Sequence, residues 1–170
     1  KHGAFGDVIL AGAAMEAIRT YHKNDYITCL TTEHFRKILE ESPWFDKVVS
    51  DLKPRWNDIK GWQNLKLIFH KYNFTTVYDL QTSYRSNLYF YIFFFTKNIK
   101  WCGIAHGSSH RHKSLNRKFM HTIDRQKAQL KLANIEYNHL PNWKWLANNY
   151  KNNSIVPVSY THLTLPTTPY

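Results

Sequence analysis

The chain has 170 residues, of which 43% are hydrophobic and 16% aromatic. This composition excludes an intrinsically disordered protein, and the length fits one globular domain with a core of its own. The two cysteines, Cys29 and Cys102, stand in separate apolar stretches without a CxxC spacing. Neither a disulfide framework nor a zinc site is therefore indicated, and we expect a reducing compartment.

The formal net charge of +11 at pH 7 favours anionic partners. Nucleic acid, phosphorylated substrates and an acidic membrane surface all fit. A second interpretation stays open, because lysine, asparagine, tyrosine and isoleucine are plentiful, as an AT-rich coding sequence would make them without selection for a ligand. The charge is spread along the chain and is not gathered in blocks, so its pattern does not separate the two interpretations.

The two ends of the sequence bear on targeting and on the domain boundaries. No secretory signal is visible, and the most apolar run, residues 88–95, is shorter than the roughly 20 residues of a membrane-spanning helix. The sequence begins with Lys1, so we expect preceding residues, including part of a first strand, to be missing. From about residue 156 the lysine and asparagine bias is lost. We interpret 156–170 as a non-native or disordered tail outside a folded domain at 1–155.

Helix-like and strand-like patterns alternate along the chain. They predict, in order, a helix at 8–21, a strand at 26–30, a helix at 33–41, a strand at 45–50, a helix at 63–73, a strand at 74–80, a helix at 86–95, a strand at 99–104, a polar loop at 105–117 and a helix at 124–135. This alternation predicts the α/β class, with a Rossmann-like parallel sheet, right-handed crossovers and flanking helices. We expect the aromatic run at 88–95 to pack in the core.

A glycine and an aspartate, Gly6 and Asp7, stand directly before the first predicted helix. In an open parallel sheet, ligands bind where strands lead into helices, and a glycine leaves the backbone open to a ligand. An aspartate at a helix start is also a common cap, so spacing alone leaves both roles open. Neither GxGxxG nor GxxxxGK[ST] occurs, so the dinucleotide and P-loop fingerprints are absent.

Three motifs, in this order, carry a resemblance to a known family. They are KHGAFGDVIL before an alanine-rich helix, YITCLTTEHFRKILEESPWFDKVV, and VYDLQTSYRS. Together they resemble the amino-terminal domain of family 9 glycosyltransferases, the bacterial heptosyltransferases of lipopolysaccharide core synthesis, over roughly residues 1–104. The resemblance implies a GT-B architecture in which this chain is the amino-terminal, acceptor-binding domain. The donor-binding domain would be absent, so we expect this fragment to be inactive by itself.

The resemblance also implies the reaction. It would be inverting transfer of heptose from ADP-heptose, the donor substrate, to an acceptor in the lipopolysaccharide inner core, without a cofactor or metal. The enzyme would be cytoplasmic, with peripheral contact at the inner membrane. A related transferase that uses another nucleotide sugar stays open. A basic RNA-binding protein is the alternative from a different class, although no RNA-recognition signature occurs and we expect no nucleic acid partner.

The family's proposed catalytic base maps onto Asp7, which would accept the proton of an acceptor hydroxyl. Because an aspartate is a weak base at neutral pH, positioning would contribute more than basicity. Lys1 matches the basic residue that often precedes this turn in the family, and Gly6 is the glycine of the turn. Gly3, however, stands where the family commonly has serine.

Further substrate contacts are implied in the third motif. Gln81 and Ser83 would hydrogen-bond sugar hydroxyls, and Arg85 would bind a carboxylate or phosphate through its planar fork of donors. An ordinary strand-to-helix turn, with Ser83 or Ser86 as the helix cap, is the alternative.

Three histidines, His106, His110 and His112, lie within one basic loop. Histidines can ligate zinc, but their spacing fits no helix-borne motif and no cysteine or carboxylate completes a set. We therefore expect no metal there. Two interpretations remain: a basic loop that contacts an anionic acceptor or lipid headgroups, and a merely solvated loop.

Overall fold

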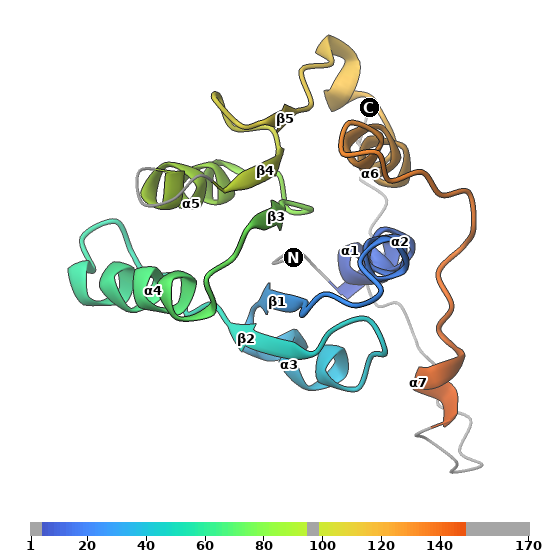
Figure 1. Cartoon of the computed structure of the whole chain (residues 1–170), viewed down its shortest axis with the longest axis horizontal. Helices are drawn as coiled ribbons and strands as arrows, with labels where there is room; N and C mark the ends of the chain where they lie inside the picture. Colours follow the sequence, from blue (N-terminus) through green and yellow to red (C-terminus); the bar gives the residue numbers. More distant parts are fainter. Residues whose placement is uncertain (1–4, 95–98, 149–170) are drawn as a thin grey trace, which may run out of the picture.

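The computed structural model describes residues 5–94 and 99–148 (Figure 1). Its helices are α1 (Phe5–Leu10), α2 (Gly12–Tyr21), α3 (Glu33–Glu40), α4 (Ile59–Tyr72), α5 (Tyr84–Phe94), α6 (Thr122–Lys131) and α7 (Lys144–Asn148), with a 3₁₀ turn, η1, at Leu115–Lys118. Its strands are β1 (Thr28–Thr31), β2 (Lys47–Ser50), β3 (Thr76–Tyr78), β4 (Lys100–Gly103) and β5 (His110–Arg111). Each predicted helix and strand has a counterpart. The tail predicted at 156–170 lies outside the described residues.

All strand pairs are parallel, as the alternation predicts. The strands form two groups, however, and not one continuous sheet. β1 pairs with β2, with Cys29 opposite Val48, while β3, β4 and β5 form a second sheet in that order. Within the described residues no hydrogen-bonded pair joins β1 to β3. The predicted α/β class, with parallel strands and flanking helices, is thus confirmed.

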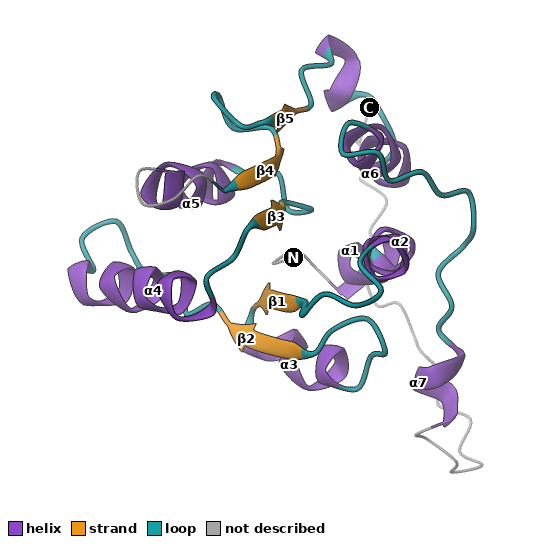
Figure 2. Cartoon of the chain, viewed as in Figure 1, coloured by secondary structure: helices purple, strands orange, loops and turns teal. Residues whose placement is uncertain are grey.

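Helices cover both faces of the strands (Figure 2). Helices α4 and α5 lie on one face, and α1, α2 and α6 lie on the other (Figure 1). The alternation of side chains along β4 shows how each face is buried. Trp101 packs with Phe90 and Phe93 of α5, whereas Cys102 packs with Ala14 of α2 and Leu130 of α6. Because successive strand residues point to opposite faces, one strand contributes to two cores. The expected burial of the aromatic run is confirmed at Phe90 and Phe93.

The first helix differs from the prediction. It begins at Phe5, so Gly6 and Asp7 lie within its first turn and do not form a turn before it. The backbone is interrupted at Ala11, after which α2 continues as a second helix. Gly12 is needed at this junction, because an added Cβ would lie 2.6 Å from Cζ2 of Trp143.

The carboxyl-terminal part of the described chain packs against the β1–β2 half. Trp143 and Trp145 contact Trp44 edge-on, with ring centroids 5.0 and 5.6 Å apart, respectively. Aromatic pairs prefer this geometry, and the contact ties α7 to the core that α3 and β2 share. No helix in residues 5–94 and 99–148 is both long enough and apolar enough to cross a membrane.

Candidate functional site

A small polar cavity opens beyond the carboxyl end of β3, the edge at which open parallel sheets bind ligands. Its volume is about 90 Å³. The loop that follows β3 forms one wall, and η1 together with the first turns of α6 forms the other. The lining residues are Leu80, Gln81, Thr82, Arg117, Thr122, Arg125 and Gln126. We call this cavity the β3–α6 pocket.

The loop after β3 is held by a buried carboxylate. Asp79 is 6% exposed, and its Oδ1 accepts hydrogen bonds from the backbone N–H groups of Gln81, at 3.0 Å, and Thr82, at 2.9 Å. Burial raises the pKa of Asp79, and the hydrogen bond from Thr82 opposes that rise. Thr82 has a φ of +48°, a left-handed conformation that is strained for a β-branched residue. Strain of this kind is concentrated at functional sites, where the surrounding structure holds it.

A buried glutamine of α6 forms hydrogen bonds to the backbone at the ends of β3 and β4. Gln129 is 1% exposed, and its Nε2 donates to the backbone oxygens of Asp79, at 2.7 Å, and Cys102, at 3.3 Å. These strand-end carbonyls lie in a low-dielectric core, where an unmet hydrogen bond is costly. Gln129 therefore sets the position of α6, and with it the basic wall of the pocket.

We expect Gln129→Leu to lower the free energy of unfolding by about 1–3 kcal/mol, because the buried Asp79 carbonyl loses the donor Nε2, while the Cys102 carbonyl keeps its bond from the backbone N–H of Asp79. Urea unfolding followed by circular dichroism measures this change. Gln126→Leu is the matched control, since its side-chain nitrogen and oxygen are buried and have no hydrogen-bond partner among the described residues. The control should cost less than Gln129→Leu. Equal losses in the two variants would show that Gln129 contributes packing alone.

Two arginines bring positive charge to the β3–α6 pocket. Arg117 Nη1 donates to Nδ1 of His112 at 2.7 Å, and Arg125 Nη2 donates to Oγ1 of Thr122 at 2.9 Å. Burial lowers the pKa of Arg117, and the nearby charge of Arg125 lowers it further. Burial also lowers the pKa of His112, so this histidine is neutral at pH 7 and accepts the bond from Arg117.

The deepest polar group of the pocket is Gln126. It is 4% exposed, and both polar atoms of its side chain lack a hydrogen-bond partner in the part of the chain that the structure describes. A buried amide is normally paired with protein, water or a ligand. With two guanidinium groups beside it, the pocket can bind an anionic group that also carries hydroxyls.

The predicted base, Asp7, is not one of the residues that line the β3–α6 pocket. Asp7 is half-buried, and its backbone oxygen accepts from Ala11 N at 3.2 Å in the first turn of α1. Val8, the next residue, and Leu80, which precedes Gln81, pack in one hydrophobic cluster. Gly6 is exposed, and no atom lies within 4 Å of the position of an added Cβ. The open backbone at Gly6 fits the predicted approach of a ligand.

The residues of the third motif separate into two groups. Gln81 lines the pocket, whereas Ser83 caps α5, because its Oγ accepts from Ser86 N at 3.3 Å while Ser83 N donates to Ser86 Oγ at 2.8 Å. Arg85 donates through Nη1 to the backbone oxygen of Pro54 at 3.0 Å and so ties α5 to the loop after β2. Structural roles thus account for Ser83 and Arg85, and their roles in binding stay predictions. Lys1 lies outside the described residues.

The histidine loop is not a pure coil. It contains β5, which pairs with β4, and it ends in η1. His110 contacts Ser109 Oγ at 3.0 Å, and His112 contacts Arg117, so the two histidines have different partners. No group of three or more histidine, cysteine, aspartate or glutamate side chains within residues 5–94 and 99–148 is placed to hold a metal ion. Both cysteines are free and buried.

The sequence did not single out Arg117, Arg125 or Gln126 as site residues. They lie about 35 to 45 positions after Gln81, and the packing of α6 against β4, together with the position of η1 before α6, brings them to it. One feature of the sequence could have indicated this site: Arg117 precedes the last predicted helix, and Arg125 lies in its first turn. Positive charge near a helix start interacts unfavourably with the helix dipole, so these arginines do not serve to stabilise the helix and indicate another role.

No family model matches the sequence, and a search of curated proteins gave no match. A search of solved structures found similarity to a protein described as the glycosyl transferase family 9 from Veillonella parvula DSM 2008, with a TM-score of 0.63 and 22% sequence identity. The chain shares its fold with part of that glycosyltransferase. The similarity covers 79% of this chain and 40% of the Veillonella protein, so this chain spans less than half the length of its structural neighbour.

Proposed function

We propose that this chain is the acceptor-binding part of a glycosyltransferase. The observation that carries the proposal is the β3–α6 pocket, where Arg117 and Arg125 lie with Gln126 at the carboxyl end of a parallel strand. The buried side chain of Gln126 has no hydrogen-bond partner among the described residues. The fold likeness to a family 9 glycosyltransferase supports the same assignment. An acceptor sugar that carries a carboxylate or phosphate would satisfy both the charge and the hydrogen-bonding groups of the pocket.

Asp7 is the proposed catalytic base. As the acceptor hydroxyl oxygen forms its bond to the anomeric carbon, the bond from that carbon to the diphosphate breaks, and the hydroxyl proton passes to the Asp7 carboxylate. Attack from the face opposite the leaving group inverts the configuration at the carbon. Since a carboxylate is a weak base, proton transfer would come late, and the site would contribute mainly by holding the hydroxyl in line.

We propose ADP-heptose as the donor and an inner-core sugar of lipopolysaccharide as the acceptor, on the strength of the motif order around Asp7 and Gln81. Such an acceptor carries acidic groups, and the net charge of +11 would favour its approach. The enzyme would then work in the cytoplasm, at the inner membrane surface. Donor binding would require a second domain joined to this one.

The test is a transfer assay on a protein that joins this chain to a donor-binding domain. ADP-heptose is supplied with a lipid A acceptor that bears the first inner-core sugar, and mass spectrometry measures the product. We expect the product to be heavier than the acceptor by one heptose, and NMR of its anomeric C–H group to show inversion. If no nucleotide-linked heptose or hexose is transferred by the folded protein, the proposed function is wrong.

A further inference from the structure

Helix α4 and the loop before it expose large apolar side chains. Leu52 is 80% exposed, Trp56 89%, Ile59 70% and Leu67 64%. Single exposed apolar residues are common on folded proteins, but a group of four within 16 positions indicates a surface with a binding partner. Trp56 is the most informative of them, because an aromatic side chain gains more than most from leaving water.

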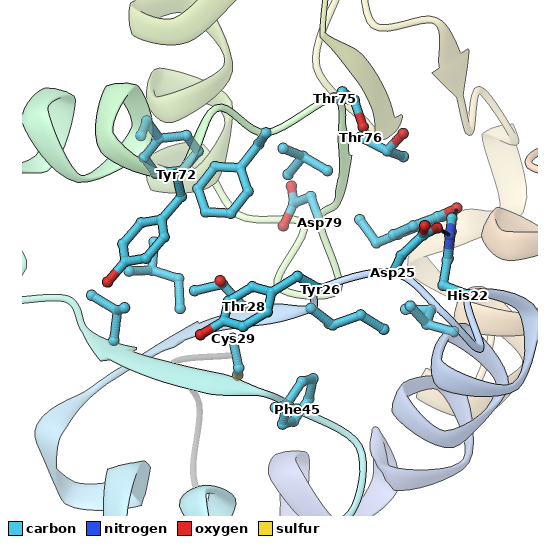
Figure 3. A pocket seen from close by; sticks show the side chains of 18 of the residues that line it. His22, Asp25, Tyr26, Thr28, Cys29, Phe45, Tyr72, Thr75, Thr76 and Asp79 are labelled. Atoms are coloured by element: carbon cyan, nitrogen blue, oxygen red, sulfur yellow. Dashed lines mark hydrogen bonds and ion pairs between the residues drawn. The ribbon is translucent and has the colours of Figure 1, made fainter.

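The two faces of α4 have different surroundings. On the inner face, Phe69 is buried, and together with Tyr72 it lines a cavity of about 410 Å³ between β1 and β3 (Figure 3). On the outer face, Lys60, Leu67 and Lys71 are exposed and share one stripe, since their spacings of seven and four residues bring them to the same side of a helix. Helix α4 lies at the outer edge of the molecule (Figure 1), so this stripe faces solvent.

Positive charge accompanies the exposed apolar side chains. Arg55, Lys60, Lys66 and Lys71 are exposed, and α4 contains no acidic residue. Asp58 is the one acidic residue in 52–72, and its side chain caps the start of α4. A helix with basic residues and exposed apolar residues is typical of proteins that lie on an anionic membrane. We call the following group the α4 surface: Leu52, Arg55, Trp56, Ile59, Lys60, Lys66, Leu67 and Lys71.

Hydrogen bonds hold the loop before α4 in place. Arg85 Nη1 donates to the backbone oxygen of Pro54 at 3.0 Å, and Trp62 Nε1 donates to that of Arg55 at 2.9 Å. Trp56 is therefore presented on a backbone that is already ordered, so little entropy is lost when it binds a partner. Tryptophan is enriched at the boundary between lipid headgroups and acyl chains, where its ring is buried and its N–H stays near water.

The loop before α4 also lies close to the candidate site. Arg85, which contacts Pro54, stands four residues after Gln81, and Gln81 lines the β3–α6 pocket. Membrane contact at the α4 surface would therefore bring a lipid-linked acceptor near the loop that carries Gln81.

We infer that the α4 surface binds anionic lipid bilayers, with α4 parallel to the membrane plane. Its apolar side chains would enter the layer between headgroups and acyl chains, and its basic side chains would contact lipid phosphates. RNA also offers phosphates, but it has no apolar layer for Leu52, Ile59 and Leu67 to enter. The inference deepens the proposed function, on which it rests for the lipid-linked acceptor, because it assigns the membrane contact to one surface of the chain.

Co-sedimentation of the 170-residue chain with lipid vesicles tests the inference. One set of vesicles is phosphatidylcholine alone, and the other contains equal parts of phosphatidylcholine and anionic phosphatidylglycerol. Leu52→Ser is compared with Leu140→Ser, because these leucines are 80% and 82% exposed and only Leu52 belongs to the α4 surface. Trp56→Ser removes the most exposed aromatic side chain of that surface. Circular dichroism shows whether each variant is folded.

We expect the chain to bind the anionic vesicles and not the neutral ones. Trp56→Ser should weaken this binding by about tenfold or more, and Leu52→Ser by about 3–10-fold, since each loses apolar surface that the bilayer would bury. Leu140→Ser should bind like the unchanged chain. Equal binding of Leu52→Ser and Leu140→Ser would overturn the inference, and so would a folded chain that does not bind anionic vesicles.

A second comparison separates the α4 surface from the diffuse charge of the chain. Lys60→Gln with Lys66→Gln should weaken vesicle binding by about tenfold or more, since each basic residue at an anionic membrane contributes to binding. Lys23→Gln with Lys37→Gln removes the same charge from other exposed positions and should cost less than about threefold. Equal losses in the two pairs would overturn the inference.

Two other partners are outcomes of the same measurements. If the lysine pair on α4 weakens binding to vesicles and to single-stranded RNA alike, while Trp56→Ser and Leu52→Ser change neither, the surface binds anions in general and the inference is wrong. It is also wrong if these apolar variants abolish a dimer on size-exclusion chromatography and leave vesicle binding unchanged. Vesicle binding needs neither donor nor acceptor. Vesicle binding without sugar transfer would thus reject only the proposed function, and transfer without vesicle binding would reject only this inference.

Discussion

Asp7→Asn is expected to reduce sugar transfer by about 10²–10⁴-fold, the usual contribution of a positioned general base. The amide keeps the size of the carboxylate but cannot accept the proton of the acceptor hydroxyl. Because Asp7 lies in the first turn of α1 and is half-buried, an isosteric change should leave the helix intact. The loss should appear in kcat, with the KM values of both substrates little changed, since the interaction is made in the transition state.

The control for this variant is the same change at another helix start. Asp58 caps α4 by accepting from the backbone N–H of Gly61 at 2.9 Å, and asparagine caps equally well there. Asp58→Asn should therefore retain both the stability and the transfer rate. If Asp7→Asn also retained its rate, Asp7 would be an ordinary residue of the first helical turn and the base would have to be sought elsewhere. Matching circular dichroism spectra and urea midpoints would show that neither variant is unfolded.

The sequence was sufficient for the order of helices and strands because the buried faces have clear periodicities. In β4, for example, Trp101 and Cys102 serve opposite faces, and the short apolar run that contains them was read correctly as a strand. The start of α1 was misplaced by three residues, because Gly6 suggested a turn whereas the structure has it in a helix. Glycine permits a turn but does not require one.

The sequence does not predict features that depend on contacts between residues far apart in the chain. Trp143 and Trp145 have no local pattern that assigns them, and only their contact with Trp44, about 100 residues earlier, shows that they belong to the core. The separation of β1 from β3 was likewise invisible in a pattern of alternating elements. Periodicity reports which face of an element is buried, but it does not report which strands are neighbours.

The same limit applies to the candidate site. Gln81 was predicted from its place after an apolar strand, and the structure puts it on the wall of the β3–α6 pocket. Ser83 and Arg85, two and four residues further on, have already entered the cap and first turn of α5. A strand-to-helix loop presents few residues to a ligand before the helix begins. The basic side of the pocket therefore comes from η1 and α6, which follow much later in the chain.

Arg117→Ala should raise the KM for an anionic acceptor by about 10–100-fold, while kcat changes much less. Loss of a charge-assisted, bidentate contact at a partly buried site costs about 1.5–3 kcal/mol, and each 1.4 kcal/mol is a factor of ten in affinity. Arg117 is a better target than Arg125 because it reaches the pocket from η1, outside the regular helix whose packing holds the site. Initial rates over a range of acceptor concentrations, at saturating donor, measure the effect.

Two further variants test whether the acceptor is bound by a specific contact with Arg117 or only attracted by positive charge. Arg117→Lys keeps the positive charge but loses the planar fork, so it should recover only part of the lost affinity. Arg111→Ala removes an arginine from β5 that donates to the backbone oxygen of Ile104 and does not line the pocket, so its acceptor KM should stay near the wild-type value. Added salt should raise the wild-type KM and have less effect on Arg117→Ala, because part of the attraction that salt screens is already gone. Equal increases in KM for Arg111→Ala and Arg117→Ala would mean that the protein's diffuse positive charge, and not the β3–α6 pocket, attracts the acceptor.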